Sequence, residues 1–352
     1  MTRINNNRLI IQRHPKLKPA RWLAAFLAFG FAPGFAPGLA LAQEPDYQAP
    51  KTAFGAPDLQ GMWTNNTITP LVRPANLGNK LVLTAEEAFQ LEQQVADYTA
   101  EQDQPSDPNR EAPDKGTIEL ADSYNNFWFD DGTQIARYNG EFRSSLIVDP
   151  PNGQIPAYTP AAQERIQAAQ LQREQRGPFD GPESRPLAER CLLSFSSSGG
   201  PPMLPILYNN NYQIVQSPGY VMILVEMVHD ARIIRIDDDP LPAEHQRWLG
   251  DSIGRWEGDT LVVETANINP SQRFANSSDS FRTVERFTRV GDNTINYSFT
   301  INDPDTFVQQ WSAEIPMQRT EDKLYEYACH EGNYSLPGVL AGARLDEIEA
   351  EQ

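Results

Sequence analysis

The succession of short strand-like runs after Tyr212 is the feature that most constrains the fold. Apolar and polar residues alternate in several of these runs, which is typical of half-buried β-strands. The dipeptide Gly258-Asp259 and the tripeptide Gly291-Asp292-Asn293 are hairpin signals between them. The runs expected to form strands are 213–216, 220–228, 231–236, 255–256, 260–266, 283–290, 294–301, 312–318 and 324–329.

Short connections between these runs indicate a β-meander, because only antiparallel neighbours can be joined by tight turns. Seven or eight such strands close most economically into an up-and-down barrel. We therefore expect a mainly β protein whose C-terminal half is a lipocalin-like antiparallel barrel or a curled sheet. A β-sandwich is the alternative.

Two helices are expected in the N-terminal half. Thr84 and Glu87 form a capping box before apolar residues at helical spacing, which predicts a helix near 85–99. Pro160 suits the first turn of a second helix near 160–175, which is rich in Ala, Gln, Glu and Arg. The N-terminal half is thus predicted to be an α-helix-containing elaboration of the barrel.

The first 42 residues have the pattern of a secretory signal peptide. Six basic residues and no acidic residue fall within 1–21, and residues 22–42 carry no charge. The apolar run ends in Ala40-Leu41-Ala42, a small-residue cleavage site. The competing interpretation is a retained membrane anchor, since 21 uncharged residues nearly span a bilayer. Glycine and proline interrupt this run, so we expect a periplasmic or secreted protein.

Signal cleavage would leave an acidic chain of about 310 residues. The signal peptide holds six of the 29 basic residues and none of the 47 acidic ones, so the mature net charge would be −24. Such a surface repels phosphate backbones and anionic lipids, which argues against nucleic-acid partners and against membrane binding after cleavage. The predicted parts are a signal peptide (1–42), the N-terminal elaboration (43–190) and a barrel-like domain (191–352).

Cys191 and Cys329 are the two cysteines of the chain. In an oxidising compartment we expect them to pair. A bridge across so long a loop stabilises a fold by roughly 2–4 kcal/mol. A reactive thiol is the alternative.

Three histidines follow the signal peptide: His229, His245 and His330. In a continuous strand His229 would lie on the face opposite Asp230, so a pair would require a turn or a bulge. His330 lies with Glu331 at the end of the last expected strand, a common place for acid–base groups. We expect His330 and His229 to be proton-transfer residues with Glu331 and Asp230 as partners, whereas His245 is expected to be structural. A structural role for His330 remains the alternative.

Other residues are expected to bind the substrate. Arg143 and Arg232 could clamp a carboxylate bidentately, or they could pair with the abundant acidic residues. The loop 194–202, rich in Ser, Gly and Pro, could approach a ligand closely.

We expect no cofactor, with a divalent metal as the alternative. His229, His330, Glu331 and Glu226 could assemble a zinc site, but no paired spacing such as His-Glu-x-x-His occurs. The sequence also has no Gly-x-Ser-x-Gly motif, phosphate-binding loop or dinucleotide fingerprint.

Several motifs resemble those of a large set of exported bacterial proteins, most of which bear the label hypothetical. The resemblance covers 124–344 and rests on 208–216, 226–232, 248–252, GRWEGDTLVV at 254–263, YEYACHEGNY at 325–334 and 340–344. It implies export and carries no catalytic residue over. Asn210 and Tyr334 lie within these motifs and are expected to contact the substrate.

Two functions remain open. The first is an exported, cofactor-independent enzyme that acts by acid–base chemistry on a small or medium organic substrate, as a lyase, isomerase or hydrolase. The second is a lipocalin-like periplasmic protein that binds a ligand inside its barrel. Convergence of His229, His330 and Arg232 would favour the enzyme, and a dry aliphatic lumen would favour the binding protein.

Overall fold

The computed structural model describes residues 47–102, 104–105, 130, 132–194, 199–272 and 274–352. All of the described residues belong to one compact unit. The expected signal peptide lies outside the described residues. None of the helices that the structure describes combines the length and hydrophobicity needed to cross a bilayer.

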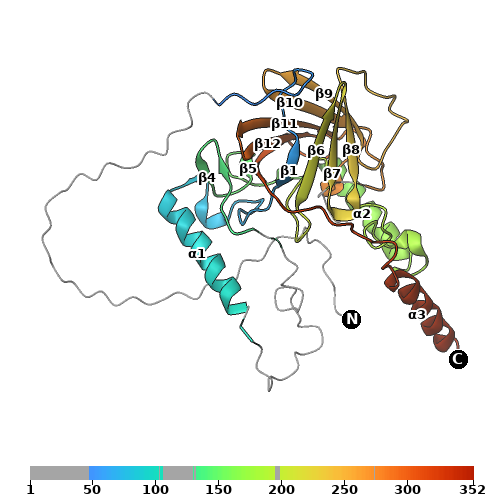
Figure 1. Cartoon of the computed structure of the whole chain (residues 1–352). Coiled ribbons are helices and arrows are strands. Elements are labelled where there is room, and N and C mark those ends of the chain that lie inside the picture. Colours follow the sequence, from blue (N-terminus) through green and yellow to red (C-terminus); the bar gives the residue numbers. More distant parts are fainter. Residues whose placement is uncertain (1–46, 103, 106–129, 131, 195–198, 273) are drawn as a thin grey trace, which may run out of the picture. The chain divides into compact units, whose positions relative to one another are not determined.

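A closed barrel forms the centre of this unit (Figure 1). Its strands in the described chain are β1 (Gly61–Thr64), β6 (Asn211–Ser217), β7 (Tyr220–Val225), β8 (Ala231–Ile236), β9 (Asp251–Glu257), β10 (Thr260–Ala266), β11 (Arg282–Gly291), β12 (Thr294–Asn302) and β13 (Trp311–Arg319). Neighbours follow this order around the ring, and β13 pairs back onto β1. The expected mainly β protein with a C-terminal barrel is therefore confirmed.

The barrel differs from the expected antiparallel meander at two places. Strands β8 and β9 are parallel, and the ring is closed by β1, from the N-terminal half of the chain, which pairs with β6 and β13. The expected strand at 324–329 is wrong, because these residues form no ladder. Strand β13 pairs with β12 on one side and with β1 and β5 (Ile147–Asp149) on the other, so the barrel closes without them.

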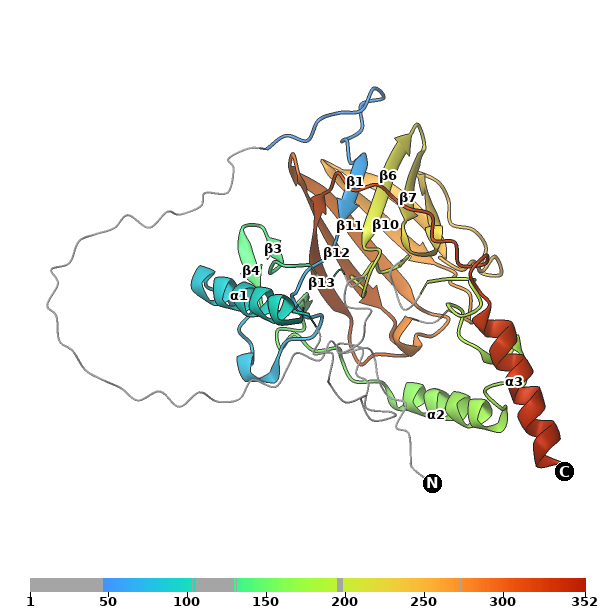
Figure 2. The same ribbon diagram turned by 60° about the horizontal axis from the view of Figure 1, so that its bottom comes forward.

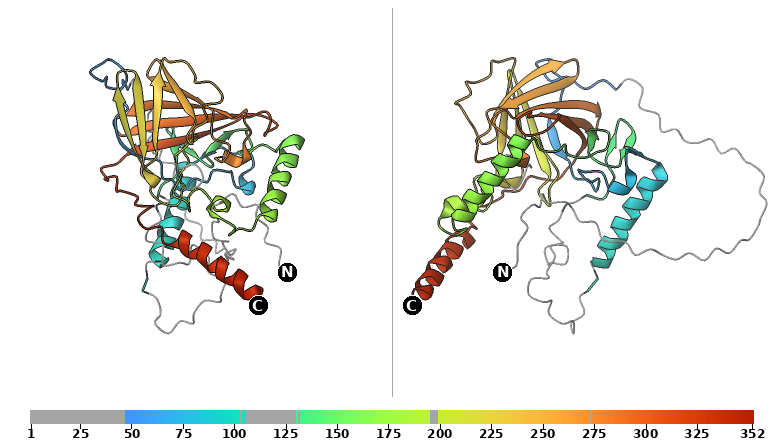
Figure 3. Two further views of the ribbon diagram at one scale, coloured as in Figure 1. Left: turned by 90° about the vertical axis from the view of Figure 1, so that its right-hand side faces the viewer. Right: turned by 180° about the vertical axis from the view of Figure 1, so that it is seen from behind.

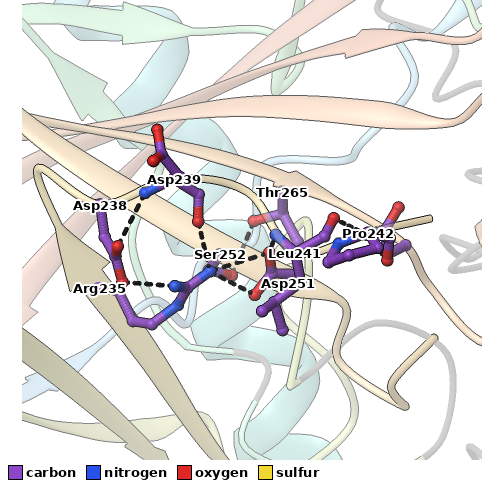
Figure 4. A network of polar contacts seen from close by, with 9 residues as sticks. Arg235, Asp238, Asp239, Leu241, Pro242, Asp251, Ser252 and Thr265 are labelled. Atoms are coloured by element: carbon purple, nitrogen blue, oxygen red, sulfur yellow. Dashed lines mark hydrogen bonds and ion pairs between the residues drawn. The ribbon is translucent and has the colours of Figure 1, made fainter. Parts of the chain in front are cut away.

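A polar network holds the crossover between the parallel strands β8 and β9 (Figure 4). Arg235 of β8 donates to the carboxylate of Asp251, the first residue of β9, at 3.1 and 3.2 Å, and to the carbonyl oxygen of Asp239 at 2.9 Å. Asp251 also accepts the backbone amide of Leu241 at 2.8 Å. Because the Asp251 side chain is buried, these bonds fix the returning loop against the start of β9.

Aromatic side chains fill the barrel interior. The rings of Phe287 and Tyr297 stack with centroids 4.8 Å apart, and Phe299 meets Trp311 edge to face at 5.6 Å. Pairs of this kind contribute about 0.5–1.5 kcal/mol beyond the burial of their surface. All four side chains are buried, so the lumen at their level is a packed core.

The helices lie outside the barrel (Figures 2 and 3). They are α1 (Ala85–Gln102), α2 (Pro160–Gln175) and α3 (Ser335–Ala350), and a small sheet of β2 (Val82–Leu83), β4 (Glu141–Arg143) and β3 (Arg137–Tyr138) flanks β13. The capping box before α1 is confirmed, since Thr84 and Glu87 exchange backbone-to-side-chain hydrogen bonds of 2.8 and 3.2 Å. Helix α3 is not predicted by the sequence.

The two cysteines form the expected disulfide. The Cα atoms of Cys191 and Cys329 lie 5.7 Å apart across a sequence separation of 138 residues. The bridge attaches the segment that precedes α3 to the loop that follows α2.

Candidate acid–base site at the turn between β7 and β8

The turn between β7 and β8 departs from strand geometry. Residues Met227–His229 form one 3₁₀ turn, with φ of +58° at Val228 and +44° at His229. Left-handed backbone at non-glycine residues costs about 1–3 kcal/mol and clusters at functional sites. The amide of Val225 donates to the carbonyl of Asp230 at 2.8 Å and closes the turn. Strand alternation therefore does not separate His229 from Asp230, and the imidazole acts electrostatically on the carboxyl.

The carboxyl of Asp230 is half-buried, and its Oδ2 has no hydrogen-bond partner among the described residues. Burial raises its pKa to about 6, although the backbone amide of Ser194 and the charge of His229 lower it. Leaving a buried acceptor unpaired costs about 1–3 kcal/mol. A carboxyl with this pKa changes its protonation state near neutral pH, which is what a proton-transfer group requires, and its Oδ2 is buried beneath the loop at Gly199.

A glycine pair lies against this carboxyl. A Cβ atom added to Gly199 would meet Oδ2 of Asp230 at 3.3 Å and the Leu249 side chain at 3.4 Å. At Gly200, where φ is +74°, a Cβ would meet Nη1 of Arg232 at 3.1 Å. The described part of the loop expected near a ligand, residues 194 and 199–202, thus touches both Asp230 and Arg232.

Arg232 lies two residues after Asp230 and points into the barrel. Its Nη1 and Nη2 donate to the Glu285 carboxylate at 3.0 and 2.5 Å, and Tyr297 donates to the same carboxylate at 2.8 Å. Burial lowers the pKa of the guanidinium, but Glu285 raises it further, so Arg232 remains a cation. Its Nε has no partner among the described residues. Both Nη groups are therefore engaged within the protein.

Arg143 and Asn210 hold parts of the chain together. Arg143 donates to Glu314 of β13 at 2.7 Å and to Glu141 at 2.6 Å, which ties the small sheet to the barrel. Asn210 is fully buried and bonds to the backbone of Ile206 and Asp130. The partners of Arg143 and Asn210 in these bonds are thus structural, and Asp230 is not among them.

His330, Glu331 and Tyr334 are exposed on the segment before α3. The disulfide at Cys329 and a 2.7 Å bond from Asn333 to the carbonyl of Glu189 hold this segment against the loop that leads to Ser194. Within the described residues, no hydrogen bond joins His330 or Glu331 to Asp230. The loop that leads to Ser194 thus contacts both Asp230 and the segment that carries His330 and Glu331, although no hydrogen bond joins these candidates to one another within the described residues.

Sequence reasoning missed Ser194, Gly199 and Glu285 as individual residues. The glycine and serine content of the loop was the only signal for the first two. Glu285 occupies an inward position of β11 between the buried Thr283 and Phe287, and a carboxylate at such a position is a readable signal for a buried partner.

No group of three or more His, Cys, Asp or Glu residues with metal-site geometry occurs within the residues that the structure describes. Comparison with protein-family models, with curated proteins and with solved structures gives no match for this chain.

Proposed function

We propose that the protein is an exported, cofactor-independent enzyme in which Asp230 transfers a proton to or from a small organic substrate. The observation that supports this most is the half-buried carboxyl with an unpaired Oδ2 at a left-handed turn. With a pKa of about 6, this group is mostly ionised at neutral pH and acts as a general base.

Each neighbouring group has a role in this proposal. The Asp230 carboxylate accepts a proton from a substrate C–H or O–H, or from a water molecule. His229 is exposed beside it and passes the proton to solvent or to a leaving group. Gly199 lets the loop backbone approach the carboxyl, and Ser194 orients it through its amide. The reaction is then an elimination, an isomerisation or a hydrolysis.

Export is supported by the disulfide, because such bridges form and persist in oxidising compartments. The signal-peptide pattern of residues 1–42 points the same way. We therefore propose the periplasm or the exterior as the place of action. There, nucleotide cofactors are absent, which agrees with acid–base chemistry by side chains.

The alternative of a lipocalin-like binding protein lacks a supporting observation. A ligand inside the barrel would have to replace the stacked rings of Phe287 and Tyr297 and the ion pair between Arg232 and Glu285. The enzyme is therefore the function that we propose.

Replacement Asp230→Asn tests the proposal. The purified protein is assayed against chromogenic esters, glycosides and uronate elimination substrates. We expect activity on at least one class, reduced about 10²–10⁴-fold in Asp230→Asn and reduced less in His229→Ala, since general acid–base groups contribute this much. Asp346→Asn on the exposed surface of α3 is the matched control and should be fully active.

Two results would overturn the proposal. One is inactivity of the wild-type protein on every class. The other is an Asp230→Asn variant that folds and keeps more than half of the wild-type rate. His330→Ala measures the role of the second expected proton-transfer residue in the same assay.

A further inference from the structure

Two separate parts of the chain hold the carboxyl of Asp230. One is the left-handed turn 226–229, which precedes it directly. The other is the loop 188–194, because the backbone amide of Ser194 donates to the carboxyl. Neither of these two segments forms a strand. The position of Asp230 therefore depends on what fixes the turn and the loop.

The loop is attached to a segment near the C-terminus, residues 325–333, which we call the C-terminal strap. The disulfide joins Cys329 of the strap to Cys191, three positions before Ser194. The side-chain amide of Asn333 also donates to a backbone carbonyl of the loop at 2.7 Å. The strap thus holds the loop by one covalent bond and one hydrogen bond close to Ser194.

The same strap contacts the turn at its first residue. The side chain of Glu226 is buried, and its carboxylate accepts the side-chain amide of Asn211 at 3.0 Å and the backbone amide of Tyr325 at 3.5 Å. Tyr327 packs against the core and forms a side-chain hydrogen bond with Tyr208. The turn and the loop that hold Asp230 are therefore both attached to one segment.

The barrel closes without the C-terminal strap. Strand β13 ends at Arg319, and β1 pairs with it there to complete the ring. Residues 325–333 themselves form no strand. Loss of the attachments of the strap should therefore release the loop around Asp230 before it affects the barrel, because local opening requires less free energy than global unfolding.

We propose that the disulfide between Cys191 and Cys329, together with Asn333, is a positioning element that keeps the amide of Ser194 on the carboxyl of Asp230. The proposal rests on the proton-transfer role of Asp230, and it adds that the activity depends on the redox state of the bridge. The disulfide then serves the site as well as the stability of the fold.

A reductant can reach the bridge from one side. Cys329 is half-buried, whereas Cys191 is buried. The thiolate of a dithiol attacks Sγ of Cys329, and the thiolate of Cys191 leaves and takes up a proton. The second thiol of the dithiol then releases Cys329, so the protein gains two electrons and two protons and the dithiol becomes a disulfide.

Hydrogen exchange of the native protein, with and without dithiothreitol, tests the positioning role. Because the bridge closes a long loop, its loss also lowers global stability, so exchange is measured at labelling times of seconds to minutes with β12 as the internal reference. We expect exchange in 188–194 and 225–231 to become about tenfold faster on reduction, while β12 stays protected.

Two variants accompany this measurement. Asn333→Ala keeps the bridge, and it should also speed exchange in 188–194. Arg344→Gln is the matched control, because Arg344 bonds α3 to the carbonyls of Phe179 and Asp180 at 3.1 and 3.2 Å and does not belong to the strap. It should leave exchange in 188–194 unchanged.

The enzyme assay tests the coupling to activity. We expect reduction to lower kcat by about 10- to 100-fold, since a displaced catalytic group costs this much. Reoxidation with oxidised glutathione should restore kcat. The double variant Cys191→Ser/Cys329→Ser should resemble the reduced protein and should not respond to dithiothreitol. A loss of stability alone leaves kcat unchanged as long as the protein remains folded.

Unchanged exchange in 188–194 of the reduced protein would overturn the positioning role. If reduction also exposes β12, Asn333→Ala decides, and unchanged exchange in 188–194 of that variant would overturn it equally. Faster exchange with an unchanged kcat would overturn the coupling to activity. Inactivity of the wild-type protein on every substrate class would instead overturn the proposed function, because the exchange measurement does not require a substrate.

Discussion

The properties of Asp230 result from its surroundings. Burial raises its pKa, and within the described residues one backbone amide and a neighbouring imidazole oppose this effect. An ionised carboxylate at this position lacks the donors that normally compensate for lost water. At neutral pH the ionised carboxylate of Asp230 therefore destabilises the folded state, as is common for catalytic groups.

The raised pKa predicts how stability depends on pH. Asp230 has a pKa of 3.8 when unperturbed and about 6 in the folded state. Between these values the folded state binds more protons than the unfolded state, so stability falls as pH rises from about 4 to about 6. Asp230→Asn removes this penalty and should raise the free energy of unfolding at pH 7.5 by about 1–3 kcal/mol, with little effect at pH 4.

Urea denaturation at the two pH values measures this difference, with Asp346→Asn as the control. An Asp230→Asn variant that is less stable than the wild type at pH 7.5 would contradict this prediction. It would mean that interactions in the folded protein stabilise the ionised carboxylate.

At the scale of elements, the β8–β9 crossover depends on side chains rather than on a short turn. A parallel pair needs a long connection, and Arg235 and Asp251 fix its two ends. The sequence did not predict this, because the residues between the strands carry ordinary turn chemistry and the two partners are 16 positions apart.

Asp251→Asn should lower the free energy of unfolding by about 1.5–3 kcal/mol, the usual contribution of hydrogen bonds to a charged group. The buried carboxylate accepts from both Arg235 and Leu241, and an amide satisfies these donors less well. Asp259→Asn, which breaks the exposed pair with Lys51, is the matched control and should change stability by about 1 kcal/mol or less. Equal effects of the two substitutions in urea denaturation would argue against the role of the network.

At the scale of the whole molecule, alternation and turn signals sufficed to predict the barrel. They could not predict its closure, because β1 has four residues and its partners are far away in sequence. The run 324–329 has strand-like residues but lies outside the ring, which β1 closes instead. Helix α3 contains Pro337 and Gly338, which weaken any helical signal. The sequence did not predict the left-handed turn at Val228 either, because a β-branched residue rarely adopts positive φ.

The pH dependence of kcat/KM for the wild-type protein and for Asp230→Asn tests the central claim most directly, because this ratio reports the pKa values of groups in the free enzyme. We predict that the wild-type ratio rises with an inflection near pH 6, the pKa of Asp230, and that this inflection is absent from the residual activity of Asp230→Asn. An inflection near pH 6 in both proteins would contradict the assignment of Asp230 as the proton-transfer residue.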